Sequence, residues 1–327
     1  MLKLIPEKKN IGKDEKVIDF NPLLKAFREH LEIRNRAKLT IKHHLWHLGK
    51  FIEYMDQFNL DDIRQIRKTH LEKYRKYRYY RKNKNDSRDS VSTQNRHLAS
   101  LKCFFAVLRR EGYILDDPTV TLAYAKEPRR LPKSALVDKE VQKLLDCPDT
   151  GTVLGFRDRT IMEVLYSTGI RRSELINLNL EDVDYKGGYL RINEGKGGRD
   201  RVVPIGKIAC EYLENYIKGI RSMFHRSDSQ PALFISKKGH RLSKNTLHDI
   251  TAKYAKMAGV KKQVTCHTFR RSCATEMIKN QANAVHIKDL LGHTSLRMIS
   301  VYCDLSIVDL KKAHKKYHPR ESEHHSS

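Results

Sequence analysis

The chain has 327 residues, which is enough for one large domain or two medium domains with a sizeable core. Its 64 Lys and Arg residues outnumber 39 Asp and Glu residues, so the formal net charge is +25. Such an excess opposes compaction unless a polyanion is the partner, and nucleic acid is the leading candidate. An anionic membrane surface is the alternative, but it requires a Trp- and Phe-rich amphipathic helix that the sequence does not show.

The composition also bears on location and on metals. No apolar run approaches the roughly 18 residues of a membrane span. The start, "MLKLIPEKKNIGKDEK", is charged and has no apolar signal core, so we expect a cytoplasmic protein. We interpret the cysteines as reduced, mostly buried thiols, because none forms a CxxC pair. A zinc site built from Cys266, His267 and Cys273 is the weaker alternative.

Residues 20–126 are predicted to form a helical domain, because apolar residues recur there at helical spacing. The segment "TIKHHLWHLGKFIEYM" predicts one helix, with Thr40 as its N-cap. Its apolar positions are Ile41, Leu45, Leu48, Ile52 and Met55. A second helix is predicted from "STQNRHLASLKCFFAVLRREGY", with Leu98, Leu101, Phe105 and Leu108 on one face.

Between these two helices, basic and aromatic residues alternate in "RKTHLEKYRKYRYYRKNKNDSRDS". This pattern suits contact with DNA phosphates combined with stacking. A solvated charged helix that runs into a loop explains the pattern equally well. The candidate DNA-binding residues of the chain are Lys42, His44, Arg75, Arg78, Arg96 and Arg201.

After the helical domain, "EPRRLPKSA" has two prolines and no period, so residues 127–137 are predicted to be a linker. A helix is then expected from Asp138, and "FRDRTIMEVLYSTGIRRSELINL" predicts two helices separated at Gly169. The segments "VDYKGGYLRI" and "RVVPI" flank the Gly-rich turn "NEGKGGRD" and predict short antiparallel strands. Helices return from residue 243, so the expected fold class is mainly α with a small antiparallel β-sheet.

Several residues of this second half have the chemistry that phosphodiester cleavage needs. Two arginines can hold the negative charge that builds up on the phosphate, and a tyrosine can attack phosphorus. A lysine can protonate the departing 5′ oxygen, and histidines can donate hydrogen bonds or move the tyrosine proton. Because guanidinium charge replaces a metal ion, neither metal nor cofactor is expected. The candidates are Arg171, Lys196, His267, Arg270, His293 and Tyr302.

These residues lie in "TGIRRSEL", "GKGGRDRVVP", "CHTFRRSCATEMI", "LLGHTS" and "VYCDL". In that order the motifs resemble the tyrosine recombinase (phage integrase) family, in particular its Xer-like branch, over roughly residues 20–320. The resemblance implies that the six candidates are catalytic and that Tyr302 is the nucleophile. It implies supporting roles for Glu174, as an orienting carboxylate, and for Arg271, which stands where the family often has a second histidine.

The resemblance also implies an architecture and a partner. We expect a C-shaped, two-domain clamp on double-stranded DNA recombination sites, with a SAM-like helical domain and a catalytic domain. It would act as a homo-tetramer, or mixed with a related recombinase, in dimer resolution or in integration and excision of a mobile element. A type IB topoisomerase-like enzyme and a non-catalytic DNA-binding regulator are the alternatives.

The expected division of the chain has five parts, and the last of them leaves one question open. The tail that follows the catalytic domain docks either on its own protomer or on a neighbour. The parts are a flexible N-terminus (1–19), the helical domain (20–126), the linker (127–137), the catalytic domain (138–313) and the C-terminal tail (314–327).

Overall fold

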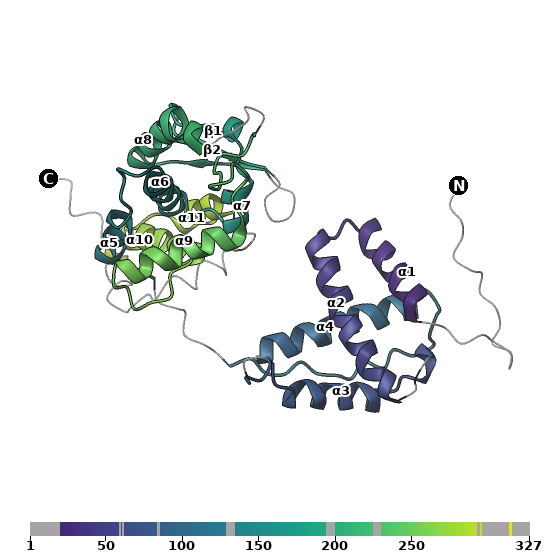
Figure 1. Cartoon of the computed structure of the whole chain (residues 1–327). Helices are drawn as coiled ribbons and strands as arrows, with labels where there is room; N and C mark the ends of the chain where they lie inside the picture. Colours follow the sequence, from purple (N-terminus) through teal and green to yellow (C-terminus); the bar gives the residue numbers. More distant parts are fainter. Residues whose placement is uncertain are drawn as a thin grey trace. The chain divides into compact units, whose positions relative to one another are not determined.

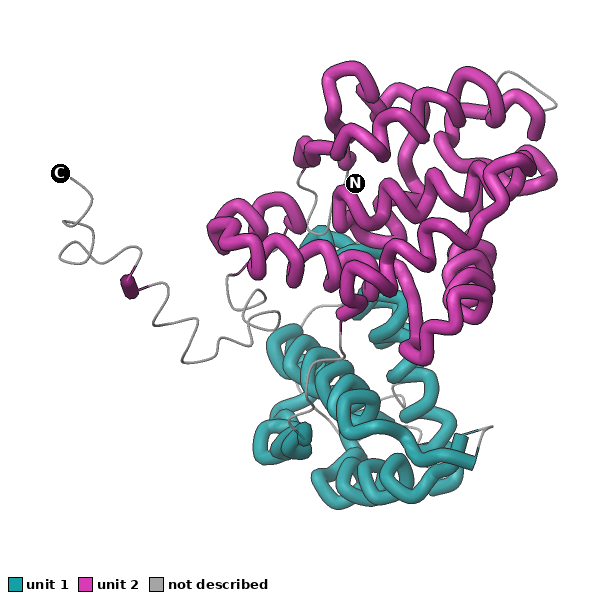
Figure 2. Tube along the Cα trace, turned by 90° about the vertical axis from the view of Figure 1, so that its left-hand side faces the viewer, with its two compact units in different colours: residues 1–130 teal, residues 131–327 magenta. Residues whose placement is uncertain are grey.

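The computed structural model describes residues 20–58, 60, 62–83, 86–128, 135–193, 200–224, 230–292, 295 and 314–315. The chain divides into two compact units, residues 1–130 and 131–327 (Figure 2). The described residues are mostly helical and include one three-stranded antiparallel sheet, which confirms the predicted fold class. The division falls inside the segment predicted to be the linker, and the finer domain limits remain predictions.

Unit 1 is a helical unit in which α4 contacts the other three described helices (Figure 1). Its helices are α1 (Phe20–Ile33), α2 (Lys38–Met55), α3 (Lys68–Tyr80) and α4 (Val91–Arg110), with 3-10 turns η1 (Asp56–Phe58) and η2 (Ile63–Gln65). The apolar faces predicted from the sequence point inward. Their buried members include Ile41, Leu48 and Met55 of α2, and Leu98, Leu101, Phe105 and Leu108 of α4.

The start of α2 differs from the prediction. The amide N–H groups of Thr40 and Ile41 both donate to the Ala37 carbonyl oxygen, at 2.8 and 3.1 Å, so the first helical turn begins before Thr40. Ala37 occupies the N-cap position and has no side chain that could cap. The prediction of Thr40 as the N-cap is therefore wrong, because the presence of a good capping residue three positions after Ala37 does not determine where the helix starts.

Aromatic side chains hold the helices of unit 1 together. Phe27 and Phe104 meet edge to face, with ring centroids 5.3 Å apart, and Phe51 meets Tyr74 at 5.2 Å. Such pairs contribute about 0.5–1.5 kcal/mol each beyond the area they bury. The Tyr74 hydroxyl lies 3.0 Å from Nδ1 of His97, so α3 and α4 also share a buried polar contact.

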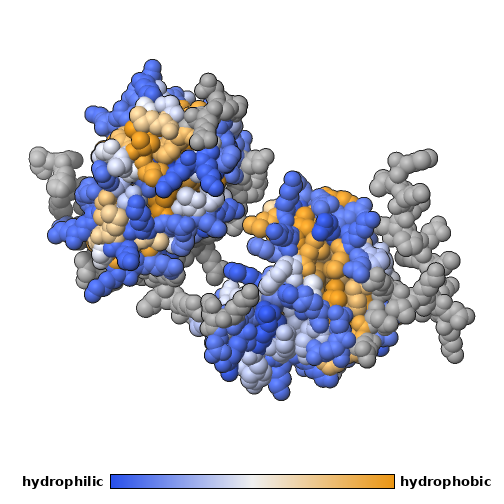
Figure 3. Space-filling model, in the orientation of Figure 1, coloured by the Kyte–Doolittle hydropathy of each residue, from blue (hydrophilic) through white to orange (hydrophobic). Residues whose placement is uncertain are grey.

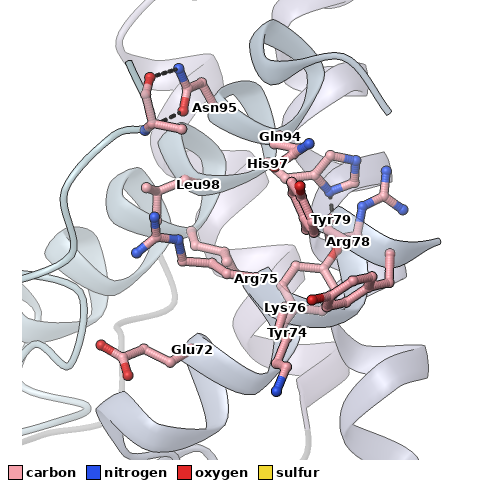
Figure 4. A pocket seen from close by; sticks show the side chains of 13 residues that line it. Glu72, Tyr74, Arg75, Lys76, Arg78, Tyr79, Gln94, Asn95, His97 and Leu98 are labelled. Atoms are coloured by element: carbon pink, nitrogen blue, oxygen red, sulfur yellow. Dashed lines mark hydrogen bonds between the residues drawn. The ribbon is translucent and has the colours of Figure 1, made fainter. Parts of the chain in front are cut away.

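The side chain of Asn95 binds the segment after α4 to that helix through two hydrogen bonds. Asn95 donates to the Ala125 carbonyl oxygen and accepts from the Ala125 amide, both at 2.9 Å (Figure 4). Ile114 and Leu122 are buried on the way and extend the core beyond the last helix. The chain therefore leaves unit 1 from a defined point.

Unit 2 combines helices with the sheet. Its described elements are α5 (Asp138–Asp146), α6 (Val153–Thr168), α7 (Arg172–Asn177), η3 (Leu180–Asp182), β1 (Val183–Asp184), β2 (Tyr189–Ile192), β3 (Arg201–Pro204), α8 (Lys207–Asn215), η4 (Tyr216–Ile220), η5 (Arg221–Phe224), α9 (Lys244–Met257), α10 (Cys266–Lys279) and α11 (Ala284–Leu291).

Helix α6 is the centre of this unit, packed against both α8 and α10 (Figure 1). Thr152 caps its start by accepting from the Gly155 amide at 3.1 Å. Gly169 ends it in the left-handed conformation, at φ 58°, as glycine does most readily. The predicted break between two helices at Gly169 is confirmed, and it turns the chain directly into the segment that carries Arg171.

The sheet has the order β1-β2-β3, with both pairs antiparallel. Leu190 pairs with Val203, and Ile192 pairs with Arg201. Leu190, Ile192 and Val203 are buried. Val202, which lies between Arg201 and Val203 in β3, is 61% exposed. The period of two therefore directs Arg201, at the start of β3, to the same side as the buried Val203.

The outer surface is mostly hydrophilic on the face seen in Figure 3. Among the described helices, none has the combination of length and apolar character that a bilayer crossing requires. The described cysteines are free thiols, and Cys266 and Cys273 are buried. Cys266, His267 and Cys273 do not gather as metal ligands, because no group of His, Cys, Asp and Glu suited to a metal forms among the described residues.

We predict that Gly169→Ala destabilises the protein by about 2–4 kcal/mol. A Cβ atom there would lie 2.7 Å from Cδ2 of Leu291, and the left-handed backbone would be strained as well. Urea denaturation measures the change in the free energy of unfolding.

Gly259→Ala is the matched control, because Gly259 also has a positive φ of 64° but no atom within 4 Å of the added carbon. Gly259→Ala should lower the free energy of unfolding only through backbone strain, by about 1 kcal/mol. Equal losses for the two variants would mean that contact with Leu291 contributes nothing.

Candidate active site

Arg171 and Glu174 form the first part of the site, at the start of α7. The Arg171 amide donates to Oε2 of Glu174 at 2.8 Å, and its Nη1 donates to Oε1 at 2.7 Å. The spacing of three residues at a helix start makes this double contact possible, because Glu174 folds back over the first turn. Glu174 thereby fixes both the backbone and the guanidinium of Arg171.

Arg201 reaches the same carboxylate from β3. Its Nη1 and Nη2 donate to the two oxygens of Glu174 at 3.0 and 2.9 Å. The carboxylate is almost fully buried, with 6% of its side chain exposed. Burial alone would raise its pKa, but the hydrogen bonds from Arg201 and Arg171 outweigh that effect and lower the pKa of Glu174 to about 2.

Arg270 comes from α10 and is also buried. Its Nη1 donates to the Gly169 carbonyl oxygen at 2.7 Å and its Nη2 to the Leu291 carbonyl oxygen at 2.6 Å. The first contact uses the peptide that ends α6, and the second uses the last residue of α11. The predicted core residues Phe269 and Ala274 of α10 are fully buried.

The three arginines converge on consecutive carbonyl groups at the end of α11. Arg201 donates through Nε to Leu290, Arg270 to Leu291, and Arg171 through Nη2 to Gly292, at 3.4, 2.6 and 2.7 Å. The last carbonyls of a helix have no partner within it and carry the negative end of the helix dipole. This end of α11 thus stabilises a cluster of cations that would otherwise repel one another.

His267 is the second residue of α10, the helix that carries Arg270, and its side chain is exposed although protein atoms surround part of the ring. Partial burial of the ring lowers its pKa, and the charges of Arg270, Arg172, Arg271 and Arg171 lower it further. This direction of shift favours the neutral imidazole, which has one nitrogen able to accept a proton. Arg271, the predicted supporting residue, directly follows Arg270 in the sequence and is half-buried.

Lys196, His293 and Tyr302 lie outside the described residues. Gly292, a described residue, immediately precedes His293 in the chain. Tyr166, a described tyrosine three residues before Gly169, donates its hydroxyl to Asp138 at 3.3 Å. Burial raises the pKa of Tyr166, with the nearby Asp138 charge acting in the same direction, which makes this hydroxyl a poorer nucleophile.

The candidate DNA contacts of unit 1 fall into two groups. Lys42 and Arg96 are exposed, as a phosphate contact requires. His44 is half-buried and lies 3.0 Å from the Ser100 hydroxyl, while Arg75 lines a cavity of about 390 Å³ between α3 and α4 (Figure 4). Arg78 is 3% exposed and paired with Asp89, so this guanidinium is part of the packing and differs from the expected surface contact.

Arg201 also differs from its expected role as a DNA contact, because its guanidinium belongs to the arginine cluster of unit 2. The alternation of "RVVP" is the sequence signal for this, since it directs Arg201 and Val203 to the same face. The sequence did not predict the acceptor role of the carbonyl groups of Leu290, Leu291 and Gly292. Every residue has a main-chain carbonyl, and a sequence pattern does not indicate which of them will bind an arginine.

Comparison with known proteins gives a family match for each of the two units. Residues 134–307 match the phage integrase family, and residues 24–112 match the phage integrase N-terminal SAM-like domain. A tyrosine recombinase XerD of Staphylococcus epidermidis is 35% identical over 225 residues, which cover 69% of this chain and 76% of that protein. XerD of Staphylococcus aureus is 36% identical over the same shares of the two chains.

Solved structures share the fold. The XerH site-specific recombinase bound to its difH substrate aligns with a TM-score of 0.66 at 22% identity, covering 89% of this chain and 82% of that chain. The Tn1549 transposon integrase in complex with transposon right end DNA aligns with a TM-score of 0.68 at 16% identity, covering 90% and 99%.

The fold and the buried arginine cluster therefore define a two-unit protein of the recombinase class. More particularly, the chain belongs to the phage integrase family and is a tyrosine recombinase, an enzyme of site-specific recombination.

We predict that Glu174→Gln destabilises the fold by about 2–4 kcal/mol at neutral pH, because the arginines lose their buried counter-charge. The pKa of Glu174 in the folded protein, about 2, lies below its ordinary value of 4.5. The stabilisation by the ionised carboxylate is therefore complete above about pH 5 and lost as the pH falls from 4.5 towards 2.

Urea denaturation of the wild type and Glu174→Gln at a series of pH values measures this difference. The gap between the two proteins should narrow on the acid side, and a gap that is the same at every pH contradicts the assignment. Glu181→Gln, at an exposed position of the same unit, is the matched control and should change stability little.

Proposed function

We propose that this recombinase cleaves and rejoins DNA strands at paired sites through a 3′-phosphotyrosine intermediate formed on Tyr302. The hydroxyl oxygen of Tyr302 attacks phosphorus, and the bond from phosphorus to the 5′ oxygen breaks. The tyrosine loses its proton, and the departing 5′ oxygen gains one. Attack by the 5′ hydroxyl of the partner strand reverses these steps and conserves the phosphoester bond, so no ATP is consumed.

Each remaining candidate has a place in this reaction. Arg171 and Arg270 hold the non-bridging oxygens of the scissile phosphate, whose charge rises in the transition state. Lys196 donates the proton to the leaving oxygen. His267 accepts the tyrosine proton or donates a hydrogen bond, together with His293. A lowered pKa supports the accepting role of His267, since the neutral imidazole is the form that takes up a proton.

The single observation that carries this proposal is the convergence of Arg171 and Arg270 on the end of α11, immediately before His293. Both guanidinium groups are oriented by protein contacts before any substrate arrives. Donors that are fixed in advance stabilise developing charge without a reorganisation cost. Glu174 orients Arg171, and Arg271 supports the same end of α10.

The proposed partner is duplex DNA, with contacts from both units. The net charge of +25 supports a polyanionic partner, and the exposed Lys42 and Arg96 of unit 1 are suited to phosphate contacts. XerH and the Tn1549 integrase, which share the fold, were solved with DNA. We propose a homo-tetramer on two paired sites, because strand exchange requires four strands to be cut and rejoined.

Strand exchange between two DNA molecules distinguishes a recombinase from a topoisomerase, which only relaxes DNA. Two duplexes of different length, each carrying a site that the protein selects from a randomised duplex pool, should yield recombinant lengths. Relaxation of a supercoiled plasmid without exchanged products would indicate a topoisomerase. Binding without any covalent product would indicate a regulator.

We predict that Tyr302→Phe abolishes cleavage and leaves DNA affinity nearly unchanged. The substitution removes only the hydroxyl, and affinity depends mainly on the basic surface. The substrate is a nicked duplex with the selected site, which traps the covalent protein–DNA adduct. A denaturing gel detects the adduct without added magnesium.

Tyr317→Phe is the matched control, because it removes the same atom from another tyrosine near the C-terminus. It should form the adduct like the wild type. An adduct that persists in Tyr302→Phe would overturn the assignment, and an absolute requirement for a metal would overturn the mechanism.

We predict that Lys196→Ala slows cleavage by roughly 100-fold or more, because the 5′ oxygen must then leave without a proton donor. A substrate with sulfur in place of that oxygen needs no protonation. The same variant should therefore cleave the sulfur substrate at close to the wild-type rate, measured in single-turnover reactions. Equal losses on both substrates would exclude Lys196 as the general acid.

A further inference from the structure

We infer that Arg201 is a positioning residue for strand cleavage, which keeps Arg171 available to the scissile phosphate; the inference builds on the function proposed above. Arg201 does this by binding Glu174 with both terminal nitrogens. Arg201 follows Lys196, the proposed general acid, by five positions in the chain. Its contact with Glu174 therefore also attaches β3, the strand that follows Lys196, to the start of α7.

The first support is the sharing of one carboxylate. Glu174 carries one negative charge and receives hydrogen bonds from both Arg171 and Arg201. If Arg171 were its only cationic partner, the two would form a closed ion pair, and the positive charge of Arg171 would be largely cancelled. With Arg201 present, the three groups together retain one positive charge, which attracts a phosphate.

The second support is the space left for the guanidinium. Gly292 has a φ of 61°, and a Cβ atom at this position would lie 3.0 Å from Cζ and Nε of Arg201. A side chain at residue 292 would therefore displace the arginine. The same glycine accepts the hydrogen bond of Arg171 through its carbonyl oxygen, so one residue accommodates Arg201 and binds Arg171.

The third support is the fixed direction of the side chain. Arg201 pairs with the buried Ile192 in the sheet and has 14% of its side chain exposed. Its Nε donates to the Leu290 carbonyl oxygen at 3.4 Å, so the guanidinium contacts α7 and α11 at once. All three nitrogens of this guanidinium, Nε, Nη1 and Nη2, therefore donate to protein groups.

The test compares Arg201→Met, Arg201→Lys and the double variant Arg201→Met/Glu174→Gln with the wild type. The probe is the nicked duplex with the selected site, used at saturating concentration, and a binding titration gives the dissociation constant separately. Arg201→Met should lower the single-turnover cleavage rate at least about 10-fold, with the dissociation constant changed less than about 3-fold.

The double variant distinguishes positioning from general support of the fold. Removing the charge of Glu174 frees Arg171 from a closed ion pair, so the double variant should cleave faster than Arg201→Met alone. Arg201→Lys keeps a positive charge but loses the two parallel donors of the guanidinium. Its cleavage rate should lie between that of Arg201→Met and that of the wild type. Arg191→Met is the matched control, because Arg191 is an exposed arginine of β2 in the same sheet.

Each outcome decides the matter. Wild-type cleavage by Arg201→Met or Arg201→Lys, or a double variant no faster than Arg201→Met, overturns the positioning role. If Arg201→Met does not fold, the rate of Arg201→Lys alone decides, and a rate equal to the wild type overturns the inference. Absence of any adduct with the wild-type protein would instead contradict the proposed function, so the two failures are distinguishable.

Discussion

Three guanidinium groups and one carboxylate meet at the end of a short helix, and the geometry of the candidate site depends on how their charges are balanced. Arginines this close repel one another when they leave water. Glu174 supplies one counter-charge, and the carbonyl oxygens of residues 290–292 supply partial charges from the C-terminus of α11. Elements distant in the sequence, α7, β3, α10 and α11, are held together by this balance.

The same balance prepares the site for an anion. The cluster retains more positive than negative charge, and its guanidinium groups are oriented by protein contacts, so it favours the approach of an anion. Partial burial lowers the pKa of His267, and the charges of the arginines lower it further. The arginines that would bind a phosphate in the proposed reaction therefore also favour the neutral form of this imidazole.

Much of this arrangement could be predicted from the sequence, because hydrophobic period and turn chemistry are local. The faces of α2 and α4, the break at Gly169 and the short strands follow from such patterns, and Arg171, Glu174, His267 and Arg270 stand in recognisable motifs. The alternation of β3 indicates that Arg201 faces inward, but the partners that Arg78 and Arg201 meet could not be predicted in the same way. Whether a basic residue faces solvent or a buried carboxylate depends on tertiary partners, here Asp89 and Glu174, that are distant in the chain or not implied by periodicity.

The three arginines bind three successive peptide groups, and consecutive peptide groups cannot move independently. A displacement of the segment 290–292 by a single residue would break the contacts of Arg171, Arg201 and Arg270 together. Arg171 and Arg201 would keep their contacts with Glu174, and Arg270 would keep its contact with Gly169. A movement of the end of α11 would therefore remove one anchor from each of the three arginines at the same moment.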